Sequence, residues 1–250
     1  MTDRRRVGVL LVEDAQFWGG MTGLWNHFLT RFSQCSDIIQ LLPIDAISGT
    51  LPTHEEELSL YDGFIITGAN YSVNDDLPWI ERLMDFVKFI HRLDSHRIFG
   101  ICFGHQVIAK ALGCKVGRNI CGDVIFSTQL VQIHDDLHTK EFFRRVFGKR
   151  DEIWMMEAHG ESVLNLPSDV RCHVLGWSKT CSYEVLGWSE KIISTQGHPE
   201  FNVNVMVNKL APMVKEYKFL TDQQLDVSLK SFSDTDADNT VKFVASFFKG

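Results

Sequence analysis

The chain has 250 residues, of which 44% are hydrophobic and 23% are charged, so it has enough apolar surface to fold and is not a mainly disordered protein. Lysine and arginine together number 25 against 32 aspartate and glutamate residues, which gives a formal net charge of −7. That balance argues against a protein that binds nucleic-acid phosphates through a basic surface.

The first hundred residues carry continuous apolar runs, which are typical of strands buried on both faces of a parallel sheet. Between these runs, residues 77–93 place apolar side chains three and four positions apart, a spacing that predicts a helix with one buried stripe. Strands that alternate with helices predict a doubly wound, mostly parallel α/β sheet with flanking helices. The expected strands are 7–12, 38–44, 64–67 and 97–101, and the other expected helices are 23–32 and the segment after Cys102.

After residue 113 the pattern changes to short strands with short turns, which predict a small antiparallel extension of the sheet. The pentapeptide Val-Leu-Gly-Trp-Ser occurs at 174–178 and again at 185–189. Two copies are too few for a repeat architecture, so we interpret them as similar antiparallel strands. The expected strands are 124–133, 153–158, 170–177, 183–188 and 192–195, and the expected helices are 201–220 and 241–248.

No linker divides the sequence, so we predict one domain over residues 1–250. Its core is expected at about 7–220, followed by an acidic segment and a C-terminal helix in 221–250. Residues 221–240 contain five aspartates against one lysine, Lys230, and we expect a solvated polar segment there.

The six cysteines include no Cys-x-x-Cys pair, and the longest apolar run near the start, 7–12, is too short for a membrane span or a secretory signal. We therefore expect free thiols, a cytoplasmic protein and no membrane partner. His134 and His138 are four residues apart without an evident third ligand, so no metal site is expected. The sequence also lacks a phosphate-binding loop and a dinucleotide fingerprint, so no organic cofactor is expected.

Cys102 follows an apolar strand and precedes a helical segment, with Gly100 and Gly104 two residues to either side. A nucleophile between two small residues at a strand-to-helix turn is the pattern of a nucleophile elbow. Such a turn exposes the side chain at the carboxyl end of the sheet, where open α/β folds bind ligands. The free amides and the dipole at the start of a helix also favour a thiolate.

A thiolate nucleophile needs a histidine, and the histidine needs a group that orients it. His198 lies just past an apolar strand, and Glu200 follows two residues later. Pro199 favours an extended conformation at His198, which places the two side chains on the same side of the chain. The His-x-Glu spacing is common, so by itself it does not exclude a structural role. We expect His105, although close to Cys102 in sequence, to pack in the helix.

The two motifs together, Gly100-Ile-Cys-Phe-Gly-His-Gln106 and Gln196-Gly-His-Pro-Glu200, resemble those of the class I (triad) glutamine amidotransferase family. The variants are most similar to a stand-alone subgroup that includes plant γ-glutamyl peptidases. The resemblance covers about residues 7–220 and implies a flavodoxin-like α/β fold. It also implies that Cys102 is the nucleophile, His198 the base and acid, and Glu200 the group that orients the histidine.

The resemblance implies further roles outside this triad. The backbone amides of Ala69 and Phe103 would form the oxyanion hole. Gln106, Gly160 and Glu161 would bind the substrate. Many family members have Gly-Pro or Gly-Gly in the loop that here contains Ala69, so the resemblance does not determine the size of the pocket or the preferred leaving group.

Three functions remain open on the sequence alone. The first is a stand-alone hydrolase or transferase that cleaves the γ-glutamyl amide bond of glutamine, γ-glutamyl peptides or glutathione-like conjugates through a γ-glutamyl thioester. The second is the glutaminase subunit of an amidotransferase whose synthase is a separate partner chain. The third is a non-enzymatic interaction or ligand-sensing module, against which the complete triad speaks. The first two differ in the leaving group, and we expect a sizeable substituent on the amine side to be preferred.

Overall fold

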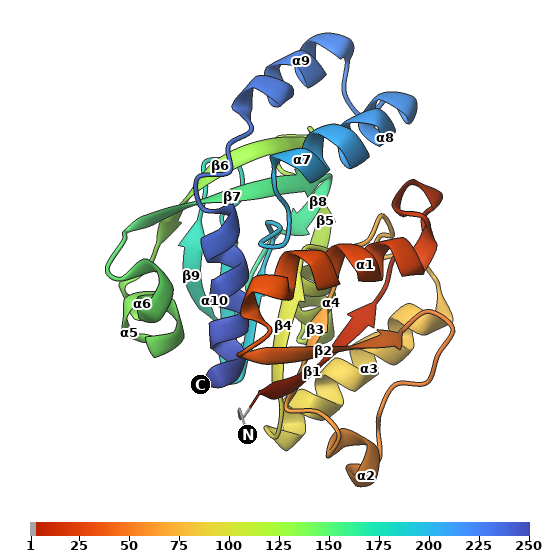
Figure 1. Ribbon diagram of the computed structural model, residues 1–250, viewed down its shortest axis with the longest axis vertical. Coiled ribbons are helices and arrows are strands. Elements are labelled where there is room, and N and C mark those ends of the chain that lie inside the picture. The colour runs from red at the N-terminus through yellow and green to blue at the C-terminus, as the bar shows by residue number, and fades with distance from the viewer. Residues whose placement is uncertain (1–3) are drawn as a thin grey trace.

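The computed structural model describes residues 4–250 and is built around one nine-stranded mixed sheet (Figure 1). Its strand order is β2-β1-β3-β4-β11-β10-β9-β6-β7. The first five strands in this order pair in parallel and the remaining pairings are antiparallel. This confirms the α/β fold with a parallel part and an antiparallel extension. The strands are β1 (Arg5–Leu11), β2 (Ile39–Asp45), β3 (Gly63–Ile66), β4 (Arg97–Ile101), β6 (Ile125–Ile133), β7 (Glu152–His159), β9 (His173–Trp177), β10 (Val185–Ser189) and β11 (Ile192–Thr195).

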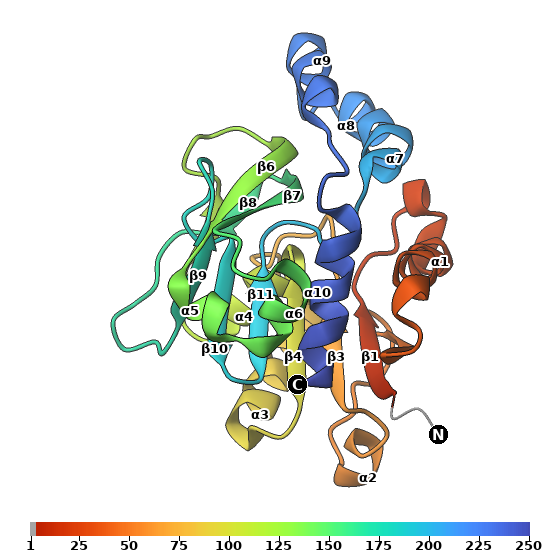
Figure 2. The same ribbon diagram turned by 60° about the vertical axis from the view of Figure 1, so that its left-hand side comes forward.

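Helices cover both faces of the sheet, as Figures 1 and 2 show from two sides. Helices α3 (Pro78–Leu93) and α4 (Phe103–Ala111) lie on one face, and α1 (Gly20–Phe32) and α10 (Ala237–Lys249) lie on the other. Successive residues of a buried strand point to opposite faces. Accordingly, Phe99 packs on the ring of Phe243 in α10, whereas its neighbour Ile98 belongs to the core under α3.

The remaining elements are short. They include a two-stranded sheet of β5 (Val116–Arg118) and β8 (Glu161–Val163), and a π-helical turn, η3 (Met206–Leu210), that interrupts the helix expected at 201–220. The other helices are η1 (Gln16–Trp18), η2 (Ser33–Cys35), α2 (Glu55–Leu58), α5 (Asp135–Thr139), α6 (Glu141–Phe147), α7 (Val203–Val205), α8 (Ala211–Glu216) and α9 (Asp222–Ser231). Elements of three to seven residues are too short to show a helical or strand period, and the sequence did not predict α2, α5, α6, β5 or β8.

The C-terminal thirty residues differ from the expectation in two ways. Most of the acidic stretch is helical, because α9 begins at a capping box formed by Thr221 and Gln224. Asp236 is buried and binds Arg150 Nη1 at 2.6 Å, so it is not part of a solvated segment. The core also continues past residue 220, since α10 packs fully buried residues such as Phe243 and Phe247 against the sheet.

The repeated pentapeptide has the predicted structural basis. Its two copies lie on β9 and β10, which are adjacent antiparallel strands with Leu186 opposite Val174. Within residues 4–250 no helix is both long and apolar enough to span a membrane.

Parallel pairing determines where the site lies. Strands β1, β3, β4 and β11 are neighbours in the sheet and run in the same direction. Their carboxyl ends therefore meet at one edge. The segments that follow these four strands contribute Glu13, Gly68, Cys102 and His198.

Candidate active site

Cys102 occupies the sharp turn between β4 and α4 with φ of 49° and ψ of −101°. A non-glycine residue at positive φ is strained, and such strain is characteristic of a nucleophile elbow. The flanking glycines are required by close contacts. A Cβ on Gly104 would overlap the Ile66 carbonyl, and one on Gly100 would lie 2.7 Å from the Gly104 oxygen. The small-residue pattern of the sequence therefore has a direct steric cause.

His198 lies beside Cys102 because β11 pairs in parallel with β4, with Thr195 opposite Ile101. Its backbone N–H donates to the carbonyl of Met156 at 2.8 Å, which fixes the chain just after the strand. Its Nδ1 lies 2.9 Å from Glu200 Oε1, so the predicted side-by-side placement of the two side chains is present. The ring of Phe201 stacks flat on the imidazole, with centroids 4.0 Å apart and an angle of 2° between the planes.

The electrostatics of the site favour a charged imidazole at His198. Burial alone lowers the pKa of His198, because it removes the charged form from water. The negative charges of Glu200 and Cys102 outweigh burial, together with hydrogen bonds to both groups, and raise the pKa to about 10. At neutral pH the imidazole is therefore protonated.

The loop after β3 passes directly over this pair. A Cβ on Gly68 would lie 2.7 Å from His198 Cε1, so only glycine fits there. Buried Glu13 holds the loop, because its carboxylate accepts the Asn70 N–H at 2.7 Å and the Ala15 N–H at 2.8 Å. Burial raises the pKa of Glu13 and these hydrogen bonds oppose the rise. Among the described residues no acceptor occupies the amide of Ala69.

The amide of Phe103, at the first position of α4, likewise has no acceptor within residues 4–250. The first amides of a helix have no partner inside it and can bind an anionic oxygen. Both amides predicted for an oxyanion hole therefore belong to segments that adjoin Cys102.

Two glutamine side chains connect Cys102 to the opposite wall of the site. Gln196 donates from Nε2 toward Cys102 Sγ at 3.6 Å. Gln106 donates from its own Nε2 to the Gln196 side-chain oxygen at 3.2 Å and to the Glu161 carbonyl at 2.8 Å. The Glu161 carboxylate accepts from the Ser72 hydroxyl at 2.8 Å. The predicted residues Gln106 and Glu161 are thus brought together with Cys102.

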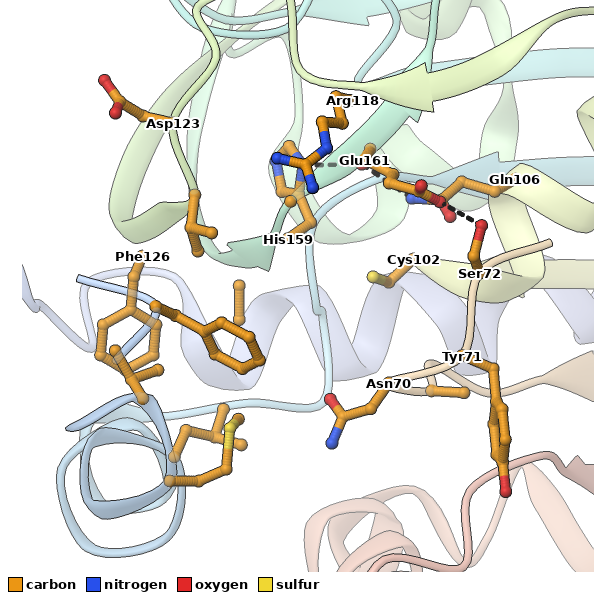
Figure 3. A pocket seen from close by; sticks show the side chains of 18 of the residues that line it. Asn70, Tyr71, Ser72, Cys102, Gln106, Arg118, Asp123, Phe126, His159 and Glu161 are labelled. Atoms are coloured by element: carbon orange, nitrogen blue, oxygen red, sulfur yellow. Dashed lines mark hydrogen bonds between the residues drawn. The ribbon is translucent and has the colours of Figure 1, made fainter. Parts of the chain in front are cut away.

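Cys102 opens into a pocket of about 450 Å³. In Figure 3, Cys102 lies between Ser72, Gln106 and Glu161 on one side and Phe126 on the other. The first side, which we call the polar lobe, also contains Arg118. The second side contains Phe126 and the carboxylate of Asp123. We use the name apolar lobe for the apolar residues that line the pocket, which are Val124, Phe126, Leu210, Met213, Val214 and Phe219.

Tyr71 is held by contacts with α3 and with the segment that follows β1. Its ring packs edge-on against Trp79 of α3 with centroids 5.2 Å apart, and its hydroxyl donates to Asp14 Oδ1 at 3.0 Å. It also lines the pocket. The aromatic side chains of the pocket lining are therefore Tyr71, Phe126 and Phe219.

His105 and His134 each have structural partners. His105 is fully buried with Nδ1 2.8 Å from the Ser194 hydroxyl, and burial lowers its pKa to about 3. This confirms packing inside the helix. His134 accepts the Asp136 N–H as the cap of α5. In the part of the chain that the structure describes, no group of three or more His, Cys, Asp or Glu side chains is arranged to hold a metal ion.

Several residues of the site were not predicted. Glu13 and Phe201 directly support the loop and the histidine, and Arg118 and the apolar lobe complete the pocket. Glu13 follows β1 at the same sheet edge, and that position was the one signal available in the sequence. Phe201 is adjacent to the His-x-Glu motif but carries no chemical signature of its own.

Comparisons with known proteins identify the family of this chain. Residues 37–211 match the family model described as glutamine amidotransferase class-I. The chain is 28% identical over 231 residues to γ-glutamyl peptidase 2 of Arabidopsis thaliana, covering 91% of this chain and 88% of that protein. It is 32% identical over 186 residues to a glutamine amidotransferase-like protein of Schizosaccharomyces pombe, covering 74% and 70%.

Two further similarities extend the comparison. The chain is 28% identical over 179 residues to one subunit of the glutamine-hydrolyzing GMP synthase of Methanothermobacter thermautotrophicus, covering 71% of this chain and 84% of that one. A crystal structure of a glutamine amidotransferase from Thermotoga maritima superposes with a TM-score of 0.71 at 18% identity, covering 98% of this chain and 96% of the other, and shows the same fold. The chain belongs to the class I glutamine amidotransferase family.

Proposed function

We propose that this protein is a hydrolase that cleaves the γ-glutamyl amide bond of γ-glutamyl peptides through a thioester on Cys102. The observation that carries the proposal is the two-lobed pocket, with a polar lobe and an apolar lobe on opposite sides of the sulfur. Free glutamine releases ammonia, which needs no apolar space. A γ-glutamyl peptide releases an amine with a side chain, for which the apolar lobe provides room.

The proposed reaction begins with the thiolate of Cys102, which attacks the γ-carbonyl carbon. The developing oxyanion accepts hydrogen bonds from the amides of Ala69 and Phe103, and each such donor contributes about 3–4 kcal/mol in comparable acyl transfers. The His198 imidazolium donates its proton to the departing amine, leaving a γ-glutamyl thioester and a neutral imidazole. His198 then removes a proton from water as the water attacks the thioester, glutamate leaves, and the thiolate and imidazolium are restored. Glu200 Oε1, which lies 2.9 Å from His198 Nδ1, orients the imidazole for both steps.

The polar lobe matches the charges of a glutamyl head group. Arg118 offers a cation for the α-carboxylate, and the Glu161 carboxylate offers a partner for the α-ammonium. Gln106 lies between Cys102 and Glu161 through its hydrogen bonds and would seat the glutamyl chain. Gly160 also lines the pocket. These assignments complete the substrate-binding role proposed for Gln106, Gly160 and Glu161.

The apolar lobe explains the preference that we propose for the leaving group. Four of its residues lie in β6, η3 and α8, whereas Val124 immediately precedes β6 and Phe219 follows α8. The π-helical turn alters the rotation of the side chains that follow it. Phe219 is 50% exposed at the rim, so it can contact a substituent without being needed for the core. Contacts distant from the scissile bond accelerate the reaction when the transition state retains them.

The test compares kcat/KM for glutamine, γ-glutamylglycine and γ-glutamylphenylalanine, without any added protein. We expect the phenylalanine compound to be cleaved best. Phe219→Ser should lower its kcat/KM by roughly fivefold, since about 1 kcal/mol of apolar contact is lost, and should change that of glutamine little. Val227→Ser is the matched control, because Val227 is exposed on α9 and does not line the pocket. A preference for glutamine would refute the role of the apolar lobe.

A second candidate, a glutaminase subunit that delivers ammonia to a separate synthase, is favoured by the similarity to the GMP synthase subunit of Methanothermobacter thermautotrophicus. Its distinguishing result is hydrolysis of glutamine that appears only when a second protein is added. If neither glutamine nor any γ-glutamyl peptide is hydrolysed under any of these conditions, the third possibility, a non-enzymatic module, gains support.

We also propose that the protein works in the cytoplasm. All six cysteines are free thiols, which suits a reducing compartment. Fractionation of cells that produce the protein tests this directly, and recovery with secreted or organellar markers would contradict it.

A further inference from the structure

A buried carboxylate that the proposed mechanism does not use joins two of the segments that meet at the sheet edge. It belongs to Glu13, which follows β1 and is only 3% exposed. Its Oε2 accepts the Asn70 N–H at 2.7 Å, and its Oε1 accepts the Ala15 N–H at 2.8 Å. Hydrogen bonds from N–H groups to a carboxylate are stronger than those between neutral groups. The loop after β3 is therefore attached to the segment after β1 by a strong buried contact.

The start of the same loop is fixed by three hydrogen bonds at Thr67. Its N–H donates to the Leu10 carbonyl at 3.2 Å, and its carbonyl accepts the Gly104 N–H at 3.2 Å. Its hydroxyl accepts the Val12 N–H, also at 3.2 Å. These contacts join the end of β3 to β1 and to the first turn of α4. The first residue of the loop therefore cannot shift independently of the sheet.

The peptide unit that carries the Ala69 N–H lies between two anchored peptide units. The preceding unit is held through the Thr67 carbonyl, and the following unit is held through the Asn70 N–H. Among residues 4–250 no backbone group binds the Gly68 carbonyl or the Ala69 N–H. The contacts on either side therefore set the direction of an amide that can itself donate to a substrate.

This amide adjoins the nucleophile. A Cβ on Gly68, the residue before Ala69, would lie 3.5 Å from the Cβ of Cys102. A hydrogen bond weakens steeply when the N–H does not point at its acceptor, and an oxyanion hole works because its donors are aimed in advance. Rotation of the Gly68–Ala69 peptide unit would therefore remove one donor without moving Cys102.

A direct part for Glu13 in the chemistry is the alternative. Glu13 lines a small cavity of about 50 Å³ together with Cys102, His198 and Glu200. However, both of its oxygens already accept short hydrogen bonds from the backbone. The proton transfers of the proposed reaction are supplied by His198, which Glu200 contacts at 2.9 Å. These contacts favour a hold on the loop over a part in proton transfer.

We propose that Glu13 is a positioning residue for the oxyanion hole, a role that rests on the proposed function. By holding the Asn70 N–H, its carboxylate keeps the Ala69 N–H directed at the developing oxyanion. Glu13→Gln replaces one carboxylate oxygen with an NH₂ group, which cannot accept from a backbone N–H. Glu13→Ala removes both acceptors. The first variant therefore weakens the hold on the loop, and the second abolishes it.

The first experiment does not depend on activity. Hydrogen exchange of individual amides, followed by NMR at pH 7, should show a protected Asn70 amide in the parent. Glu13→Ala should speed the exchange of that amide by roughly tenfold or more, because local opening no longer breaks a hydrogen bond. The Thr67 amide, whose acceptor is unchanged, should keep its rate. An Asn70 amide that stays equally protected in both Glu13 variants would refute the hold on the loop.

The second experiment measures kcat and KM for γ-glutamylphenylalanine. Loss of one oxyanion donor typically lowers kcat by 100-fold or more, so we expect a fall of roughly 100-fold in Glu13→Ala and roughly tenfold in Glu13→Gln. KM should stay within about threefold, because the oxyanion exists only in the transition state and the intermediates near it. An oxyanion forms both when the thioester is made and when it is hydrolysed, so kcat falls whichever step limits the rate. Glu13→Gln keeps the volume of the side chain and serves alone if Glu13→Ala does not fold.

The rate at which iodoacetamide alkylates Cys102 separates the oxyanion hole from the nucleophile. Displacement of iodide by the thiolate forms no oxyanion, so this rate should be unchanged in both Glu13 variants. Glu57→Gln is the matched control for all three measurements. Glu57 is an exposed carboxylate on α2 that also accepts two backbone N–H groups, those of Thr53 and His54, but it lies outside the pocket.

The outcomes separate this proposal from its alternatives. If kcat is unchanged in the Glu13 variants, or if the alkylation of Cys102 slows in proportion to kcat, the role in the oxyanion hole is refuted. A loss of activity in Glu13→Gln as large as that in Cys102→Ala would show a direct part in the chemistry and would overturn the positioning role. If the parent hydrolyses no γ-glutamyl compound, the proposed function fails, and the catalytic part of this proposal fails with it. The amide exchange still decides whether Glu13 holds the loop.

Discussion

Replacement of Glu200 by glutamine tests the electrostatic basis of the site. The substitution keeps the shape of the side chain and its contact with His198 Nδ1 at 2.9 Å, and removes one of the two negative charges that raise the pKa of His198 from 6.5 to about 10. That difference corresponds to about 5 kcal/mol in favour of the imidazolium. The effect is shared between Glu200 and Cys102, after the opposing effect of burial has been overcome. A charged hydrogen bond typically accounts for about 1.5–3 kcal/mol.

We therefore expect Glu200→Gln to lower kcat/KM at pH 7 by roughly 10- to 100-fold. The alkaline fall in activity should also move to lower pH, because the imidazolium loses its proton sooner. The assay is a pH profile of kcat/KM from pH 6 to pH 10.5, with Glu55→Gln on the exposed surface of α2 as the control. An unchanged alkaline fall in Glu200→Gln would show that Glu200 does not hold the charge on His198.

The raised pKa of His198 also predicts an effect of Glu200→Gln on the pH dependence of stability. A histidine whose pKa is raised by folding stabilises the protein fully below 6.5, and this stabilisation is lost as pH rises through about 10. The parent should therefore lose stability between these values. Glu200→Gln should lose less, and urea unfolding at pH 7 and pH 10 measures the difference.

Two further predictions concern the nucleophile. Cys102→Ala and His198→Ala should each abolish γ-glutamyl hydrolysis while the circular dichroism spectrum stays unchanged. The double variant should be no worse than either single variant, because the two residues act as a unit. Near-normal turnover in Cys102→Ala would contradict the mechanism. Limiting iodoacetamide at neutral pH should label Cys102 before Cys35, Cys114 and Cys172. Burial raises the pKa values of these three thiols to about 11, 11 and 12, so they react slowly. Peptide mapping that finds one of these three labelled first would count against the nucleophile elbow. Cys121 is exposed on a surface loop, so Cys121→Ser provides a background free of that competitor.

The sequence predicted the catalytic candidates because their signals are local. Each signal depends only on the backbone conformation of a few consecutive residues. The glycines on either side of Cys102 are required because larger residues there would clash with neighbouring backbone. The proline between His198 and Glu200 restricts the backbone conformation at His198. The alternation of strands and helices then places both segments at one sheet edge, because parallel neighbours end together. The assignment of catalytic roles to these residues stays a prediction, as does the division of the chain into one domain over residues 1–250.

The rest of the site depends on contacts between distant segments. Glu13 reaches Asn70 across 57 positions, and Gln106 reaches Gln196 across 90 positions. The apolar lobe likewise combines β6 with α8, and neither segment differs in composition from ordinary core. Such features follow from the packing of the whole sheet.

The most direct test of the account is to trap the intermediate. The protein is mixed with γ-glutamylphenylalanine, quenched in acid within the first turnovers and digested, and the peptide that contains Cys102 is examined by mass spectrometry. The account predicts one added glutamyl group on Cys102, which disappears on treatment with neutral hydroxylamine and is absent in Cys102→Ala. Hydrolysis that proceeds at full rate in Cys102→Ala, or a glutamyl group attached to another residue, would contradict it.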